Sequence, residues 1–438
     1  MSGALRVRSA DRPLTGTTTV PGDKSLGHRA LLLSALADGS STIRGFPGGA
    51  DVRATLGAMR ALGASIDWDG GDTVRVEGRG LELGVGVDAT LDCANSGTTM
   101  RLAAGLVAAV PGRRRLDGDA SLRRRPMERV AEPLRRMGAR IDTTAGRAPL
   151  TIDGAALVGV ACTLEVASAQ VKSALLLAGL RAKGTTRVVE PLATRDHTER
   201  MLRHMGVPVV VEDLAVAVTG GHRLAPLDVT LPGDPSSAAF LVVAALLVPG
   251  SRLRVTGVGT NPRRTGALEI LRRMGARITI EDATDEAGEP CGAVVVEHAP
   301  LHGTTIAPDE IPGAIDELPI LAVAAAFAEG ETRVTGAAEL RVKESDRIAA
   351  LEQLGPLGVA FEPTRDGFVV RGRPDTTIAR GTIATHGDHR IAMAFAVAGL
   401  RSLEGVTIDE PRCADVSFPR FFDRLGALGA RVDTPEGT

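Results

Sequence analysis

The chain has 438 residues, a formal net charge of −2 and 44% hydrophobic residues. A charge this close to neutral provides no electrostatic footprint for binding nucleic acid or a membrane surface. With nine Phe, one Trp and no Tyr, the core must consist mainly of Leu, Val, Ala and Ile. The length exceeds what one hydrophobic core usually serves, which predicts two domains.

The sequence also indicates where the protein works. Residues 1–20 contain no apolar run of signal-peptide length, and no uninterrupted apolar run is long enough to span a bilayer. The cysteines lie far apart and show neither metal-type nor disulfide-framework spacing; they are Cys93, Cys162, Cys291 and Cys413. These observations predict a soluble, cytoplasmic protein that binds neither nucleic acid nor membranes.

Six stretches of the chain follow one plan, in which a polar cluster precedes an almost purely apolar helix and then an amphipathic helix that stops at a glycine. The polar clusters are Lys24-Ser25, Ser96-Gly97-Thr98, Ser168-Ala169-Gln170, Ser236-Ser237, Asp316-Glu317 and Asp388-His389-Arg390, and the stopping glycines are Gly63, Gly138, Gly206, Gly275, Gly358 and Gly429. Such self-similarity predicts six copies of one unit of roughly 70 residues.

The apolar helices, for example at 30–37, 173–180, 238–248 and 318–328, are hydrophobic all round and are expected to be buried on every side. Their partners show amphipathic spacing, as in Val130, Leu134 and Met137, with Pro126 just inside the helix, and in Phe418, Phe421, Phe422 and Leu425. A short alternating strand follows each glycine. The pattern predicts an α/β fold with helices inside and strands outside, although two ordinary doubly wound sheets remain an alternative.

The repeat divides the chain into halves. Pro21-Gly22-Asp23 recurs as Pro232-Gly233-Asp234, and Pro-Gly fixes one backbone dihedral while it frees the next. We therefore predict hinges at Pro21-Gly22 and Pro232-Gly233. They bound one domain of residues 21–232 and a second of residues 1–20 and 233–438, each holding three units.

Chemically useful side chains gather at helix starts, where unpaired backbone N–H groups favour anions. Lys24, Ser25 and Arg29 share one such start, and the second copy of that motif lacks both cations, so they are additions to the scaffold. Only four of the 51 basic residues are Lys, which favours a specific need for an ammonium at Lys24. The turn 95–101 is suited to close approach of an anion to the backbone.

The second half contributes carboxylates and further cations. Asp316-Glu317 lies at the start of a buried helix. Acidic and basic residues alternate in segment 341–347 at the start of the next helix, and segment 386–390 lies at the start of the last buried helix. His386 and His389 have no third ligand at a suitable spacing, so no metal is expected. Carboxylates within reach of Lys and Arg fit proton transfer at a polyanionic site.

Together, the motifs at 21–29, 95–101, 118–126, 168–170, 341–347 and 388–390 resemble those of the 3-phosphoshikimate 1-carboxyvinyltransferase (EPSP synthase) family, in the same order and over essentially the whole chain. The resemblance implies a two-domain enolpyruvyl transferase fold of six βαβαββ units, three per domain. It also implies transfer of the enolpyruvyl group of phosphoenolpyruvate to the 5-hydroxyl of shikimate 3-phosphate, in a cytoplasmic monomer without metal or organic cofactor.

The resemblance further implies a role for each matching residue. Asp316 would accept the proton of the attacking hydroxyl, Glu344 would exchange a proton with the methylene carbon, and Lys24 would assist catalysis. Shikimate 3-phosphate would bind Lys24, Ser25, Arg29, Ser168, Ala169, Gln170, Arg195, Asp316 and Lys343. Phosphoenolpyruvate would bind Lys24, Gly97, Arg125, Gln170, Arg347 and Arg390.

At two positions the sequence departs from the family pattern, so the roles of the family's residues there are not assigned to this chain. Val416 stands where some members have a Lys, and Glu339 stands where others have an Asn, so neither contact is expected here. The alternatives are a UDP-N-acetylglucosamine enolpyruvyl transferase and a non-catalytic repeat scaffold that binds anions. The first usually has a loop cysteine, which residues 106–126 lack, and the second would spread similar charges over all six units.

Overall fold

The structure is a computed structural model that describes residues 3–10 and 12–434. The described residues group into two compact units. The N-unit comprises Gly22–Pro232 and Asp285–Glu289, and the C-unit comprises the described parts of Met1–Pro21, Gly233–Thr284 and Pro290–Thr438. Each unit has its own hydrophobic core, built mainly from Leu, Val, Ala and Ile side chains.

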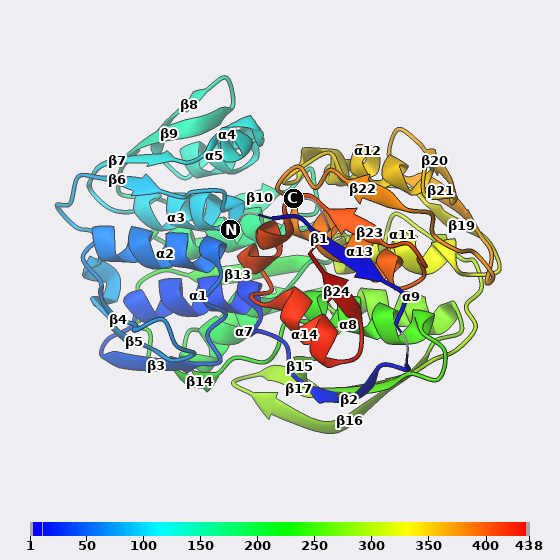
Figure 1. The fold of residues 1–438 in the computed structure, drawn as a ribbon. Coiled ribbons are helices and arrows are strands. Elements are labelled where there is room, and N and C mark those ends of the chain that lie inside the picture. Colours follow the sequence, from blue (N-terminus) through cyan, green and yellow to red (C-terminus); the bar gives the residue numbers. More distant parts are fainter. Residues whose placement is uncertain (1–2, 11, 435–438) are drawn as a thin grey trace. The chain divides into compact units, whose positions relative to one another are not determined.

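The core of the N-unit surrounds three apolar helices, α1 (Lys24–Ala35), α3 (Gly97–Ala108) and α6 (Ala169–Gly179). Helix α3 packs against both α1 and α6 (Figure 1). The amphipathic partners are α2 (Ala50–Ala61), α5 (Glu128–Arg136) and α7 (His197–His204), with the short helices η1 (Gly80–Glu82) and α4 (Ala120–Arg124) between elements.

Three four-stranded sheets complete the N-unit. Their strand orders are β14 (Asp228–Thr230), β3 (Ser40–Arg44), β5 (Val74–Glu77), β4 (Ser65–Asp67); β6 (Ala89–Asp92), β7 (Gly112–Asp117), β9 (Arg147–Gly154), β8 (Arg140–Thr144); and β10 (Ala161–Thr163), β11 (Thr185–Val189), β13 (Ala215–Thr219), β12 (Val209–Glu212). In each sheet the first pair is parallel and the other pairs are antiparallel. Parallel neighbours need a crossover, and an apolar helix supplies it between β6 and β7 and between β10 and β11.

The C-unit repeats this plan around α8 (Pro235–Leu247), α11 (Leu318–Ala326) and α13 (His389–Gly399), each of which packs against the other two. The remaining helices are α9 (Gly266–Arg273), α10 (Ile311–Ala314), η2 (Ala338–Val342), α12 (Arg347–Leu351), η3 (Glu352–Leu354), η4 (Pro411–Val416) and α14 (Phe421–Ala427). The sheets are β2 (Thr15–Thr18), β15 (Arg252–Gly259), β17 (Glu289–Glu297), β16 (Arg277–Glu286); β18 (Thr305–Ile306), β19 (Gly330–Val334), β21 (Phe368–Gly372), β20 (Ala360–Pro363); and β22 (Gly381–Ile383), β23 (Val406–Ile408), β1 (Leu5–Arg8), β24 (Arg431–Asp433).

Three strands join sheets whose other members lie far away in sequence. Strand β14 pairs with β3, and the first two strands of the chain pair within the C-unit, β1 with β23 and β24 and β2 with β15. The repeating unit is therefore closed in space by segments from other parts of the chain, which the repeat pattern alone does not reveal.

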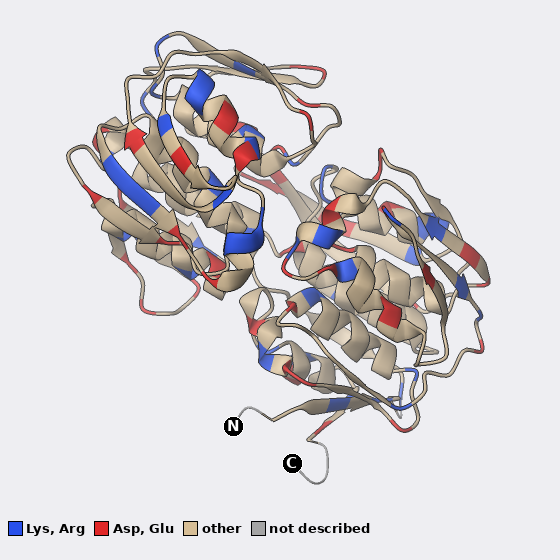
Figure 2. Cartoon of the chain, turned by 90° about the horizontal axis from the view of Figure 1, so that it is seen from above, with Lys and Arg blue, Asp and Glu red and all other residues tan. Residues whose placement is uncertain are grey.

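The predicted fold class is confirmed: among the described residues, each unit has apolar helices inside and mixed sheets around them, and the alternative of two doubly wound sheets is wrong. Figure 2 shows few charged residues on the helices at the centre of each unit. Two local details differ from expectation. Pro126 precedes the N-cap Met127 of α5 instead of lying inside the helix, and Phe418 precedes α14. In both places the chain continues irregularly before the helix begins.

The polar clusters are the first turns of the apolar helices, and side chains cap five of the six. Asp23, Ser96, Ser168, Asp234 and Asp388 each accept a hydrogen bond from a backbone N–H one turn inside, whereas Glu317 precedes α11 without such a bond. A side-chain oxygen at this position satisfies an otherwise unpaired donor. The capped starts hold the adjacent basic and hydroxyl side chains in defined positions.

Candidate active site

In the N-unit, the start of α1 places Lys24 against a carboxylate that sequence reasoning did not single out. The Lys24 Nζ atom lies 2.8 Å from Asp51 Oδ2, in the first turn of α2. The two side chains are 16% and 10% exposed, so the pair is screened from bulk water on most sides. The ammonium is therefore oriented by Asp51, and an ammonium group carries three hydrogen-bond donors.

Ser25, Arg29 and Arg195 lie close together at the start of α1. Arg29 is buried and donates through NH1 to the Ser25 backbone oxygen at 3.0 Å, while Arg195 NH1 donates to Ser25 Oγ at 3.2 Å. The Nε of Arg29 donates to Thr198 Oγ1 at 2.8 Å. Burial lowers the pKa of the Arg29 guanidinium to about 10, and the negative charge of Glu199 opposes that shift. Arg29 thus stays cationic at neutral pH.

A second group of side chains surrounds the starts of α3 and α6. Gln170 accepts a hydrogen bond from Arg101 through Oε1, and its Nε2 donates to Thr98 Oγ1 at 2.8 Å. Arg125 NH2 donates to Asn95 Oδ1 at 2.6 Å. A Cβ atom added to Gly97 would lie 3.2 Å from Arg125 NH1, so glycine leaves room for this guanidinium beside the helix start. Ser168 caps α6 and Ala169 begins it.

A buried hydrogen-bond chain connects these helix starts. His28 Nδ1 lies 2.6 Å from Thr55 Oγ1, which lies 2.7 Å from Thr99 Oγ1, and Thr99 donates to Ser96 Oγ at 2.8 Å. Burial lowers the pKa of His28 to about 3, so its imidazole is neutral at physiological pH. This series of hydrogen bonds adds no charge beside Lys24, and it connects α1, α2 and α3.

In the C-unit, all five predicted residues form one cluster around Asp316. Its carboxylate lies 3.4 Å from Lys343 Nζ, 3.5 Å from Arg347 NH1 and 3.8 Å from Arg390 NH2. Arg390 NH1 also donates to the Asp316 backbone oxygen at 3.0 Å. Glu344 accepts from Arg347 NH2 at 2.7 Å. Two carboxylates and three cations thus alternate within hydrogen-bond or ion-pair distance.

Arg347 is fixed by a second, deeper carboxylate. Its Nε and NH2 donate to the two oxygens of Asp388, at 2.9 and 3.3 Å, and both side chains are at most 1% exposed. Burial alone would lower the pKa of Arg347, yet Asp388 and Glu344 raise it well above its ordinary value. Burial raises the pKa of Asp388, but the attraction of Arg347 outweighs this effect and the net pKa is lowered. The pair is therefore ionised at neutral pH.

Replacing Asp388 with Asn should lower the free energy of unfolding of the C-unit by about 3–5 kcal/mol, because Arg347 would keep a buried charge without its main partner. Urea denaturation at pH 7 measures this loss, and Asp375→Asn, at an exposed position, is the control. Since the pKa of Asp388 is lowered by folding, the wild-type advantage is present above the unfolded-state pKa of about 3.9 and disappears as pH falls further. If the difference in free energy of unfolding between wild type and Asp388→Asn disappeared near neutral pH, it could not come from the ion pair of Asp388 with Arg347.

Sequence reasoning assigned no contact to four residues around the site, Asp51, Thr198, Asn95 and Asp388, although the last two stand within the motifs 95–101 and 388–390. Asp51 and Asn95 carried a local signal, because each lies at or just before a helix start. Thr198 and Asp388 act through contacts with residues 169 and 41 positions away in the chain, and no local pattern indicates such pairs.

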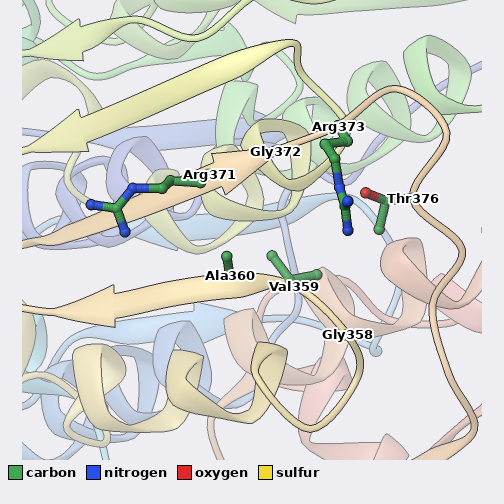
Figure 3. A pocket seen from close by; sticks show the side chains of 7 residues that line it. All are labelled: Gly358, Val359, Ala360, Arg371, Gly372, Arg373 and Thr376. Atoms are coloured by element: carbon green, nitrogen blue, oxygen red, sulfur yellow. The ribbon is translucent and has the colours of Figure 1, made fainter.

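A cavity of about 360 Å³ lies elsewhere in the C-unit, lined by Gly358, Val359, Ala360, Arg371, Gly372, Arg373 and Thr376. Figure 3 shows Arg373 beside Thr376, whereas the side chain of Arg371 points away from these two residues. Arg371 is already paired with Glu331 and Glu362, at 3.3 and 3.2 Å. None of the predicted site residues lines this cavity.

The described residues include no group of three or more His, Cys, Asp and Glu side chains that could hold a metal ion. Within residues 3–10 and 12–434, no helix is both long and apolar enough to cross a membrane. The clustered side chains are guanidinium, ammonium, carboxylate and hydroxyl groups, which suit binding of phosphate and carboxylate groups together with proton transfer.

Comparison with solved structures gives the class of protein. The enolpyruvyl transferase NikO from Streptomyces tendae superimposes with a TM-score of 0.76 at 21% identity, covering 98% of each chain. An EPSP synthase from Acinetobacter baumannii superimposes with a TM-score of 0.87 at 42% identity, covering 98% of this chain and 99% of that one. The chain therefore has the two-domain enolpyruvyl transferase fold.

Sequence comparison narrows the class. The profile of the family "EPSP synthase (3-phosphoshikimate 1-carboxyvinyltransferase)" matches residues 9–425. A 3-phosphoshikimate 1-carboxyvinyltransferase from Halorhodospira halophila is 54% identical over 96% of this chain and 95% of that protein, and one from Geobacter metallireducens is 49% identical over 95% and 97%. The chain belongs to the EPSP synthase family and is an enzyme. The family match favours neither of the alternative functions.

Proposed function

We propose that this chain transfers the enolpyruvyl group of phosphoenolpyruvate to the 5-hydroxyl of shikimate 3-phosphate and releases phosphate. Membership of the EPSP synthase family supports this reaction. The structural observation that carries the proposal is the C-unit cluster, in which Asp316 lies 3.4–3.8 Å from three cations and Glu344 pairs with one of them. Two carboxylates among fixed cations match an addition–elimination between anionic substrates.

The reaction needs proton transfer at two atoms. When the 5-hydroxyl oxygen attacks C2 of phosphoenolpyruvate, the hydroxyl must lose its proton and C3 must gain one; when phosphate leaves, C3 loses a proton and the new double bond forms. We assign the hydroxyl proton to Asp316, whose charge Lys343 and Arg390 stabilise, and the C3 proton to Glu344. Positioned carboxylates of this kind typically contribute 10²–10⁴-fold to such steps.

The proposed ligands of shikimate 3-phosphate are nine residues. In the N-unit they are Lys24, Ser25, Arg29, Ser168, Ala169, Gln170 and Arg195, and in the C-unit they are Asp316 and Lys343. The short distances among Ser25, Arg29 and Arg195 support a phosphate site at this helix start, because backbone N–H groups and guanidinium groups both favour an anion.

The proposed ligands of phosphoenolpyruvate are Lys24, Gly97, Arg125 and Gln170 in the N-unit and Arg347 and Arg390 in the C-unit. Each arginine is at least 93% buried and held by a hydrogen bond or ion pair to a neighbouring residue, so its guanidinium is orientated before ligand binding. Guanidinium groups bind carboxylate and phosphate bidentately and keep their charge. Lys24 is assigned to both substrates and to catalysis.

The domain organisation and the cellular setting are part of the proposal. We assign hinges to Pro21-Gly22 and Pro232-Gly233; next to them, Asp23 N donates to Pro232 O and Asp234 N donates to Pro21 O, both at 2.8 Å. Amide exchange at Gly22 and Gly233 that is unaffected by both substrates would contradict hinges there.

We also propose a cytoplasmic monomer, which the four free cysteines support. Light scattering coupled to size-exclusion chromatography tests the monomer, and cell fractionation tests the location. A stable dimer in the first measurement, or recovery of the protein outside the cytoplasmic fraction in the second, would contradict the respective part.

Phosphate release tests the reaction itself. The purified chain should release phosphate only when shikimate 3-phosphate and phosphoenolpyruvate are both present. UDP-N-acetylglucosamine with phosphoenolpyruvate is the matched control and should give no release. Release with the nucleotide sugar instead would favour the related transferase, and no release with either acceptor would favour an anion-binding scaffold.

Replacing Gly97 with Ala should raise KM for phosphoenolpyruvate about tenfold to 100-fold, with a smaller effect on shikimate 3-phosphate. The new Cβ would lie 3.0 Å from Arg101 NH1 and 3.2 Å from Arg125 NH1, so both guanidinium groups must shift. One displaced charge-assisted hydrogen bond costs about 1.5–3 kcal/mol. Gly57→Ala is the control, because a Cβ there meets nothing within 4 Å. Equal increases of both KM values would show that Gly97 is assigned to the wrong ligand.

A further inference from the structure

Beneath the proposed phosphate site of the N-unit lies a buried charge cluster that the reaction does not use. The Lys172 Nζ atom lies 2.7 Å from Glu190 Oε2 and 2.7 Å from Glu199 Oε1. The three side chains are 1%, 4% and 2% exposed. A buried ion pair is costly to desolvate and is weak support for stability by itself, so a trio of this kind calls for another explanation.

The position of the cluster in the chain suggests that explanation. Lys172 lies in the first turn of α6, two residues after Gln170. Glu190 follows β11 directly, and Glu199 lies in the first turn of α7. One ammonium therefore holds both ends of the segment 190–199, which carries Arg195.

Neighbouring residues extend this anchoring to the substrate side. Thr194 donates to the other oxygen of Glu190, inside the same segment. Ser173, next to Lys172, lies 2.7 Å from Thr198, next to Glu199, and Arg29 donates to both hydroxyl groups, at 2.9 and 2.8 Å. The ion pair of Lys172 with Glu199 and the hydrogen bond between Ser173 and Thr198 thus form two adjacent links between α6 and α7. Arg29 joins one of them.

Glu199 is placed between two cations. Its Oε1 contacts Lys172, and its negative charge acts on Arg29 strongly enough to oppose the effect of burial on that pKa. The second oxygen, Oε2, is buried and has no hydrogen-bond partner among the described residues. A movement of Lys172 or Glu199 would therefore change the electrostatic environment of Arg29 as well as the path of the segment that carries Arg195.

We propose that Lys172 is a positioning residue for shikimate 3-phosphate, which holds Arg195 and Arg29 in their binding geometry through Glu190, Glu199 and Thr198. The proposal rests on the assignment of Arg29 and Arg195 to that substrate. Lys172 itself touches no substrate; it reduces the reorganisation that the two arginines would otherwise undergo on binding, since preorganised donors bind more tightly.

The test compares Lys172→Met, Lys172→Arg and the double variant Lys172→Met/Glu199→Gln. The double variant keeps the net charge of the trio unchanged, so it stays informative if the single Met variant fails to fold because two carboxylates are left buried without a cation. Lys183→Met is the matched control, because Lys183 is exposed. Arg195→Ala provides the reference effect of losing a direct ligand.

In the double variant, KM for shikimate 3-phosphate should rise about tenfold or more, while kcat and KM for phosphoenolpyruvate change less than about threefold, because only the shikimate ligands lose their support. Lys172→Arg should recover part of the loss because it keeps the charge. Amide exchange of residues 190–199 should become faster in the double variant without substrate. Lys183→Met should resemble wild type.

An unchanged KM for shikimate 3-phosphate in the double variant would overturn the proposal. Parallel losses in kcat and both KM values, accompanied by a lower Tm, would also overturn it, because they indicate a purely structural role. An unchanged KM in Arg195→Ala would show that the site assignment is wrong, and with it the positioning role. Wild-type protein that never releases phosphate with shikimate 3-phosphate would show instead that the proposed reaction is wrong.

Discussion

Glu344→Gln is expected to lower kcat about 10²–10⁴-fold with little change in the free energy of unfolding, because it removes a positioned proton-transfer group from the site. Glutamine has nearly the shape of glutamate but cannot exchange a proton with the substrate carbon. Arg347 keeps its bidentate contact with Asp388, so the geometry of the cluster should survive. Phosphate release under saturating substrates measures the effect.

Isotope exchange separates this role from simple binding. In deuterated solvent, wild-type enzyme should incorporate deuterium into the methylene carbon of phosphoenolpyruvate or product, and Glu344→Gln should lose this incorporation along with turnover. Glu352→Gln is the control, because Glu352 is an exposed carboxylate in η3. Deuterium incorporation at the wild-type rate in Glu344→Gln would assign the carbon proton to another group, even if phosphate release were slow.

Lys24→Arg is expected to lower kcat/KM for both substrates about 100-fold or more, although the charge is conserved. The Lys24 ammonium is a compact donor at the start of α1, held 2.8 Å from Asp51. The larger planar guanidinium would have to displace Asp51 or move away from the substrates. Loss of one preorganised donor to a developing charge typically costs 10²–10³ in rate.

Asp51 and Lys183 complete the test of Lys24. Asp51→Asn should produce a smaller loss than Lys24→Arg, because it leaves the ammonium in place but removes the partner that orients it. Lys183→Arg, at an exposed position, should leave kcat/KM unchanged. Near-normal turnover of Lys24→Arg would show that any cation suffices at the start of α1, and the assignment of Lys24 to catalysis would have to be withdrawn.

The helices of this protein were predictable because their signals are local. All-round hydrophobicity identified α1, α6, α8 and α11, and the polar clusters before them became caps such as Ser96 and Asp388. Capping and periodicity depend on residues within one or two turns, so they can be read directly from the sequence. The motifs at these starts also placed every predicted site residue at or near the beginning of a helix.

Strand partners were less predictable, because pairing in a sheet depends on segments distant in sequence. The sequence assigned residues 1–20 to the second half, but it did not indicate that β1 would lie between β23 and β24, or that β14 would pair with β3. Residues 5–8 and 15–18 are short and contain few strongly hydrophobic side chains. Their role as strands comes from the open sheet edges that they complete, a tertiary effect that local propensity does not contain.

The sequence by itself determined the six-fold repeat, the buried helices, the family and which residues stand at the helix starts. Only the tertiary structure decided their partners: Asp51 for Lys24, Asp388 for Arg347, and Glu190 with Glu199 for Lys172. The physical reason is that charged side chains are buried only where an opposite charge or a hydrogen-bond partner compensates the lost hydration. That partner lies 18 to 41 residues away in these pairs, on a different element, where packing alone brings it within reach.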